Sequence, residues 1–114
     1  MNHLQFRVVL ADDLLPVQAF FNALPDDRFL HLLDGMLDGI GIDYNGVGCV
    51  LPGEDDESAP ENGILFYVGS EEKWLPDERV LKHFDAAVEA YLATHPQDKE
   101  RGTSLLQKAA RIWS

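Results

Sequence analysis

The 114-residue sequence has a single cysteine, Cys49, so it cannot form an internal disulfide. It also has no apolar run close to the roughly 18 residues that a membrane-spanning helix needs. The N-terminus lacks a basic start followed by an apolar stretch, which is the pattern of a secretory signal peptide. These absences favour a soluble protein of a reducing compartment, and we expect a cytoplasmic location.

Basic residues are also few: nine Lys and Arg face twenty Asp and Glu, for a formal net charge of −11. A field of this sign repels nucleic acids and anionic membranes, and it steers association with basic partners. An acidic surface also keeps a protein soluble, so the charge alone leaves both roles open. No glycine-rich phosphate loop is present, since Gly39-Ile40-Gly41 lacks the further glycine and the strand-to-helix context. We therefore expect neither direct binding of nucleic acid nor a cofactor.

The acidic residues are concentrated in the middle third of the chain. Residues 41–80 hold ten acids and two bases, a net charge of −8, against −4 for residues 1–40 and +1 for residues 81–114. The excess falls mainly in the polar segment 52–62 and in the segment 70–78. A local excess is more typical of a binding surface than of general solubilisation, so we expect a site for a basic protein here.

The six Phe, three Tyr and two Trp residues supply apolar mass for a core. Apolar residues three and four positions apart predict four helices, at about 16–24, 26–40, 77–94 and 97–113. Apolar runs bounded by glycine predict strands, at 44–51 and 63–69, with a short hairpin partner at 74–75. We expect the strand at 63–69 to be central and covered on both faces, and Gly48 to have a close neighbour.

This order of elements favours the α+β class: a small antiparallel sheet of about three to four strands, packed with about four helices. The length fits one domain over residues 1–114. Within it, residues 1–12 are expected to form a peripheral strand or arm.

Two groups of residues could carry chemistry. His31, Asp34 and Asp38 fall on one side of the second predicted helix and could approach a metal ion. They also lie opposite the apolar stripe, where solvated polar residues belong. Cys49 occupies an apolar register of a predicted strand, which indicates a buried structural thiol. We therefore expect no metal site, and a metal-dependent hydrolase remains an alternative that rests on these three residues.

Several short segments resemble one protein family, and together they span roughly residues 14–110. They are 16–30 (PVQAFFNALPDDRFL), 39–42 (GIGI), 48–52 (GCVLP), 63–68 (GILFYV) and 91–99 (YLATHPQDK), with an acidic loop before the fourth. This order is similar to that of the immunity proteins that bacteria with contact-dependent growth inhibition (CDI) make against ribonuclease toxins. Residues 36–38 fit the family pattern less well.

The resemblance implies a protein without enzymatic activity that stays in the cytoplasm of the producing cell. It would bind the toxin domain delivered by a neighbouring cell and block its nuclease site. Independently, the local charge excess predicts acidic contacts and aromatic anchors for such a partner. The predicted contact residues are Glu54, Asp55, Asp56, Glu57, Glu61, Glu71, Glu72, Tyr44 and Trp74. An acidic adaptor that binds another basic protein is the remaining alternative.

Overall fold

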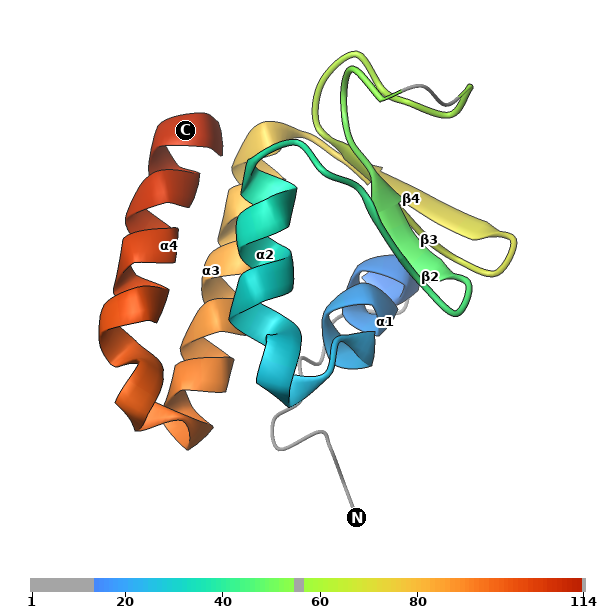
Figure 1. Cartoon of the computed structure of the whole chain (residues 1–114). Helices are drawn as coiled ribbons and strands as arrows, with labels where there is room; N and C mark the ends of the chain where they lie inside the picture. The colour runs from blue at the N-terminus through green and yellow to red at the C-terminus, as the bar shows by residue number, and fades with distance from the viewer. Residues whose placement is uncertain (1–13, 55–56, 114) are drawn as a thin grey trace.

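The computed structural model describes residues 14–54 and 57–113. The expected strand or arm at residues 1–12, and the predicted contacts Asp55 and Asp56, lie outside the described residues. The helices are α1 (Leu15–Ala23), α2 (Phe29–Leu37), α3 (Asp77–Thr94) and α4 (Lys99–Trp113). The strands are β1 (Ile42–Tyr44), β2 (Val47–Val50), β3 (Ile64–Val68) and β4 (Glu71–Leu75). Short 3₁₀ turns, Asp26–Arg28 and Pro96–Asp98, precede α2 and α4. The α+β class is thus confirmed, with four helices and a four-stranded antiparallel sheet (Figure 1).

The strands follow one another in the order β1-β2-β3-β4, each antiparallel to the next. Residues 44–51 were expected to form one strand, and this expectation is wrong. They belong to two strands that a hairpin turn joins at Asn45 and Gly46. Both turn residues have positive φ, 58° and 84°, which is the backbone conformation that a two-residue hairpin turn requires and an Asn-Gly pair adopts readily.

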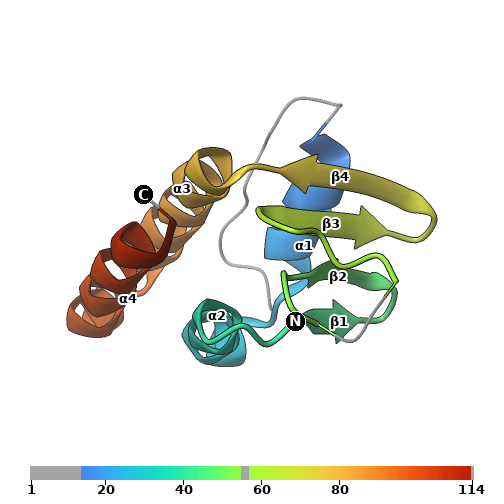
Figure 2. The same ribbon diagram turned by 90° about the horizontal axis from the view of Figure 1, so that it is seen from above.

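α1 lies across one face of the sheet and contacts β2, β3 and β4 (Figure 2). The core between them is built on Phe20 and Phe21 of α1 and Phe66 of β3, all fully buried. The rings of Phe20 and Phe66 meet edge to face with centroids 5.3 Å apart, and Phe20 and Phe21 do so at 5.1 Å. This geometry is the one that the quadrupoles of aromatic rings favour.

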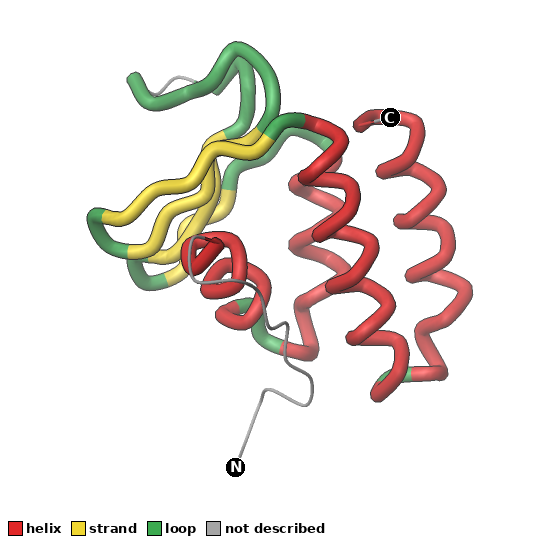
Figure 3. The backbone as a smooth tube through the Cα atoms, turned by 180° about the vertical axis from the view of Figure 1, so that it is seen from behind, coloured by secondary structure: helices red, strands yellow, loops and turns green. Residues whose placement is uncertain are grey.

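The other three helices stand beside the sheet, and α4 packs against both α2 and α3 (Figure 3). Phe84 of α3 and Trp113 of α4 meet edge to face at 5.2 Å, and Phe29 of α2 stacks on Tyr91 of α3 at 4.8 Å. α2 ends at Leu37, so Ile40 lies outside the helix and is exposed rather than part of its apolar stripe. None of the described helices is long and apolar enough to cross a membrane.

Candidate partner-binding face

The sheet has one face packed on α1 and one face that no described helix covers (Figure 2). Because side chains alternate along a strand, Phe66 and Cys49 point to the helix side, while Leu65 and Tyr67 point away. β3 is interior in the sheet, as predicted, and among the described helices only α1 packs on it, on one face. We call the uncovered side the open sheet face. It carries these residues: Asp43, Gly48, Val50, Leu65, Tyr67, Glu72 and Trp74. Val50, beside Leu65, is buried, with 7% of its surface exposed.

Tyr67 lies across the middle of the open sheet face. Its hydroxyl donates a 2.5 Å hydrogen bond to Oδ2 of Asp43, two strands away. Gly48 lies between them on β2, and a Cβ atom there would stand 2.6 Å from the Tyr67 hydroxyl and would clash with the Ile42 carbonyl. The close neighbours expected for Gly48 are therefore the Tyr67 ring and the backbone of β1. Glycine is needed at this position because a side chain would collide with both.

Trp74 is the most exposed aromatic side chain among the described residues, at 45%. Its indole Nε1 donates a 2.7 Å hydrogen bond to the carbonyl of Asn62, and its ring lies against Gly63. The polar edge of the indole is thus held in place while part of the ring remains accessible. A large, fixed and exposed aromatic group is the usual form of a binding anchor.

The loop between β2 and β3, residues 52–62, is called the acidic loop. The carboxylate of Glu54 accepts hydrogen bonds from the backbone N–H of Leu51 at 2.7 Å and of Gly41 at 3.2 Å. Glu54 thereby ties the base of the acidic loop to the segment that leads from α2 into β1. Glu57 and Glu61, farther along the loop, are exposed.

The structure gathers only some of the predicted contact residues on one surface. Glu72 and Trp74 lie on the open sheet face, with the acidic loop ending beside Trp74. Glu71 and Tyr44 are exposed, but they share the register of Val68 and Val47 and so belong to the side that carries α1.

Two residues of the open sheet face, Asp43 and Tyr67, escaped the sequence analysis. The Asn-Gly pair at 45–46 was the signal that could have found them. It places a hairpin there, and the alternation on both sides of that turn then puts both residues on one face.

Two of the three residues of the metal-dependent alternative, Asp34 and Asp38, pair with a lysine. Nζ of Lys108, on α4, lies 3.0 Å from Asp34 Oδ1 and 2.9 Å from Asp38 Oδ1. The hydrogen bonds to Asp38 and Asp34 raise the pKa of the Lys108 ammonium above its ordinary value. Across the described part of the chain, no group of three or more His, Cys, Asp and Glu side chains could hold a metal ion. These two carboxylates instead connect α2 to α4.

Cys49 is buried on the helix side of the sheet, with 3% of its surface exposed. Burial, with a smaller contribution from the negative charge of Glu54, raises the pKa of the thiol to about 12. The thiolate is the reactive form of cysteine, so this group is inert near neutral pH. The prediction of a structural cysteine is confirmed.

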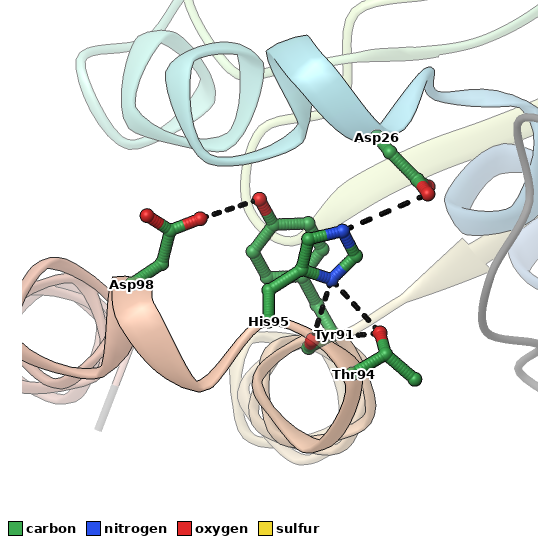
Figure 4. A network of polar contacts seen from close by, with 5 residues as sticks. All are labelled: Asp26, Tyr91, Thr94, His95 and Asp98. Carbon is green, nitrogen blue, oxygen red and sulfur yellow. Dashed lines mark hydrogen bonds and ion pairs between the residues drawn. The ribbon is translucent and has the colours of Figure 1, made fainter.

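A second polar cluster, at the end of α3, contains a histidine, a tyrosine and two carboxylates (Figure 4). His95 stacks on Tyr91 with ring centroids 4.0 Å apart, and its Nε2 lies 3.7 Å from Asp26 Oδ2. The Tyr91 hydroxyl donates a 2.7 Å hydrogen bond to Asp98. The His95 Nδ1 lies 3.0 Å from the carbonyl of Tyr91 in the last turn of the helix. The contact between His95 and Asp26 thus holds the 3₁₀ turn before α2 against the end of α3. The bond between Tyr91 and Asp98 holds the 3₁₀ turn before α4 in the same way. His95 ends α3, as predicted.

Tyr91→Phe is expected to lower the free energy of unfolding at pH 7 by about 1 kcal/mol, the usual loss for one hydrogen bond. Burial first, and then the hydrogen bond and charge of Asp98, raise the pKa of the Tyr91 hydroxyl above its ordinary value of 10.0. The folded state therefore favours the neutral phenol. Its contribution is complete below pH 10 and is lost as the pH rises toward the raised value.

Urea titrations of both proteins between pH 7 and pH 11 check this expectation. The stability difference between wild type and Tyr91→Phe should shrink above pH 10. A difference that stays constant up to pH 11 would contradict the assigned role of the hydroxyl.

These features define an α+β protein with accessible aromatic groups and carboxylates on its sheet and in the loop beside it. A family model described as CDI immunity protein matches residues 13–106, and the chain belongs to this family. An immunity protein of this kind neutralises its cognate CDI toxin. No curated protein matches the chain.

Proposed function

We propose that the chain binds and neutralises a ribonuclease toxin domain delivered by contact-dependent growth inhibition, in the cytoplasm of the cell that makes it. The observation that carries the proposal is the open sheet face with the acidic loop at its edge. Exposed Trp74 and Glu72 lie on this face, and the exposed loop acids Glu57 and Glu61 lie in the loop beside it.

The chemistry of a ribonuclease supports this partner. Such an enzyme holds RNA phosphates with Lys and Arg, so its cleft is basic. Carboxylates that enter the cleft, or cover it from an adjacent surface, occupy those cations and exclude RNA. Opposite charge also raises the rate of association, because it steers the two proteins during diffusional encounter. Speed is useful here, since the toxin must be bound before it cleaves RNA.

The proposed contacts are the acids of the acidic loop and of β4, with two exposed aromatic anchors. They are Glu54, Asp55, Asp56, Glu57, Glu61, Glu71, Glu72, Tyr44 and Trp74. Among them, Glu54 has a structural function as well, because its carboxylate holds the base of the loop. Replacing Glu54 would therefore disturb the loop, and a test of its charge is better made with the other loop acids.

The double variant Glu57→Gln, Glu61→Gln is expected to slow association with the toxin about three- to tenfold at low salt, because it removes two steering charges. The partner in this assay is the purified toxin domain of the cognate CDI system. Stopped-flow or surface plasmon resonance at low and high ionic strength measures the rates. The effect should fade at high salt, where exposed charges are screened.

The matched control is Glu89→Gln, Glu100→Gln, which removes the same charge from exposed positions of α3 and α4. Equal slowing by both double variants would reject the acidic loop as the steering surface. The proposal that the toxin is a ribonuclease is checked with an RNA-cleavage assay. One equivalent of the chain should abolish cleavage by the toxin domain, and a toxin domain without ribonuclease activity would overturn that part.

A further inference from the structure

A groove lies between α2 and β1, the edge strand of the sheet on the side of that helix (Figure 2). Its volume is about 480 Å³. It is separate from the open sheet face, because Ile42 and Tyr44 line it from the side of the sheet that carries α1. Two of the side chains that line the groove, Ile40 and Tyr44, are large and exposed, at 61% and 39%.

The helix side of the groove is open because α2 has a glycine there. Gly35 lies in the interior of α2 and lines the groove. Among the described side chains, only Ile40 is within reach of a Cβ atom at this position, and its Cδ1 would be 4.0 Å away. That distance is an ordinary van der Waals contact. Neither the described packing nor a positive φ therefore requires glycine at this position.

Gly102 of α4 shows the contrast. A Cβ atom there would stand 2.7 Å from Cδ1 of Leu92, so the packing of α3 on α4 requires glycine. Glycine in the interior of a helix lowers stability, because it loses the most backbone freedom on folding. At Gly102 close packing explains this loss. At Gly35 the described residues leave the space empty, and contact with another molecule would account for it.

The end of α2 holds Ile40 beside this space. Gly39 has a φ of 88°, and its N–H donates a 3.0 Å hydrogen bond to the carbonyl of Met36. The N–H of Ile40 donates a 3.0 Å hydrogen bond to the carbonyl of Gly35. This pair of bonds is the Schellman ending of a helix, in which the residue after the glycine often packs on the side chain one turn back. Because Gly35 has no side chain, Ile40 remains largely exposed.

The charges around the groove suit a basic partner. Its lining carries three carboxylates, those of Asp34, Asp38 and Asp43. Arg28 belongs to the same lining, and Lys108 pairs with Asp34 and Asp38. The carboxylates therefore outnumber the Lys and Arg side chains. The side chain of Asp38 is 58% exposed, and a carboxylate can accept several hydrogen bonds, so it can pair with a further donor.

We propose that this groove receives an apolar side chain from the basic surface of the toxin domain, and this inference rests on the proposed function. Leu32, Ile40 and Ile42 supply apolar surface for that side chain, and Gly35 leaves room for it. The carboxylates at the rim pair with Lys or Arg residues beside it in the toxin domain. A buried anchor inside a polar rim is the usual composition of a protein interface.

The test measures the stability and the toxin affinity of two Gly35 variants. Gly35→Ala should raise the urea midpoint of the free chain by about 0.5 M, because alanine is the better helix former. It should also raise the dissociation constant for the purified toxin domain of the cognate CDI system about fivefold, because the added methyl group occupies the groove. Gly35→Leu fills more of the groove and should raise this constant about tenfold or more. Isothermal titration calorimetry measures both constants.

The matched control is Thr103→Ala, which places a better helix former at an exposed position of α4. It should raise the urea midpoint and leave the dissociation constant unchanged. An alanine scan of the exposed apolar residues of the toxin domain then identifies the inserted side chain. One of these replacements should weaken binding to the wild-type chain but not to Gly35→Leu.

Three results would reject the groove alone. They are an unchanged toxin affinity in both Gly35 variants, a toxin domain with no apolar residue coupled to Gly35, and a dimer of the free chain that Gly35→Leu dissociates. The dimer would mean that a second copy of this chain occupies the groove. Failure of the wild-type chain to bind the toxin domain rejects the proposed function, and the groove as a toxin site with it.

Discussion

Trp74→Ala is expected to weaken binding of the toxin domain about 30-fold, or about 2 kcal/mol, which is the typical cost of removing an aromatic hot spot. The reason is the combination of exposure and fixed position. The indole is 45% exposed, and its Nε1 is held by the Asn62 carbonyl at 2.7 Å. The ring can therefore enter a pocket of the partner without a large loss of side-chain entropy. Isothermal titration calorimetry with the purified toxin domain measures the change.

The stability of the free chain separates this effect from unfolding. Trp74→Ala should lower the free energy of unfolding by only about 1 kcal/mol, because one neutral hydrogen bond and a partly exposed ring are lost. Trp74→Phe keeps a ring without the N–H group and should show an intermediate affinity. An affinity that Trp74→Ala leaves unchanged would exclude Trp74 as an anchor and move the interface away from this part of the open sheet face.

Phe66→Ala is expected to lower the free energy of unfolding by about 3–5 kcal/mol, the range for truncating a buried phenylalanine. The side chain of Phe66 extends from β3 toward α1 and is fully buried. Its ring contacts the rings of Phe20 and Phe21. Alanine would leave a cavity at the point where α1 and β3 meet. A loss of this size is a large fraction of the roughly 5–15 kcal/mol that stabilises a typical domain.

The adjacent residue of the same strand provides the control. Leu65 points to the open sheet face and is only half-buried, so Leu65→Ala should cost about 1 kcal/mol. Urea denaturation followed by circular dichroism measures both variants. Equal losses at the two positions would mean that the second face of the sheet is also covered in solution, which would remove the basis for a binding site there.

The helices were predictable because each has an apolar stripe that the periodic pattern displays. Val17, Phe20 and Phe21 show this in α1, and Val80, Phe84 and Val88 show it in α3, where all six are buried. The burial of His83 on that same face was not predicted. Its burial, followed by the charges of Arg79 and Lys82, lowers the pKa of the imidazole. The helical pattern specifies which positions face inward, but not how closely the neighbouring elements enclose them.

The strands were less predictable because strand patterns are short and a tight turn can hide inside an apolar run. The segment 44–51 illustrates this: it reads as one strand until Asn45-Gly46 is recognised as a turn. The predicted ends of the strand at 63–69 were nearly right, since β3 spans Ile64–Val68. Its second face was expected to be covered, but the apolar run alone could not show that the described helices pack on one side only.

The sequence by itself determined the α+β class, the buried cysteine and the excess of acid in residues 41–80, because composition and periodicity depend only on the order of residues. The tertiary structure alone decided which acidic residues lie on the same face of the sheet. Asp43 and Glu72 are 29 positions apart in the chain, yet they occupy one row because strand pairing sets the register between them. Glu71 and Glu72 are adjacent in sequence, yet they lie on opposite faces, because a strand sends successive side chains to opposite sides.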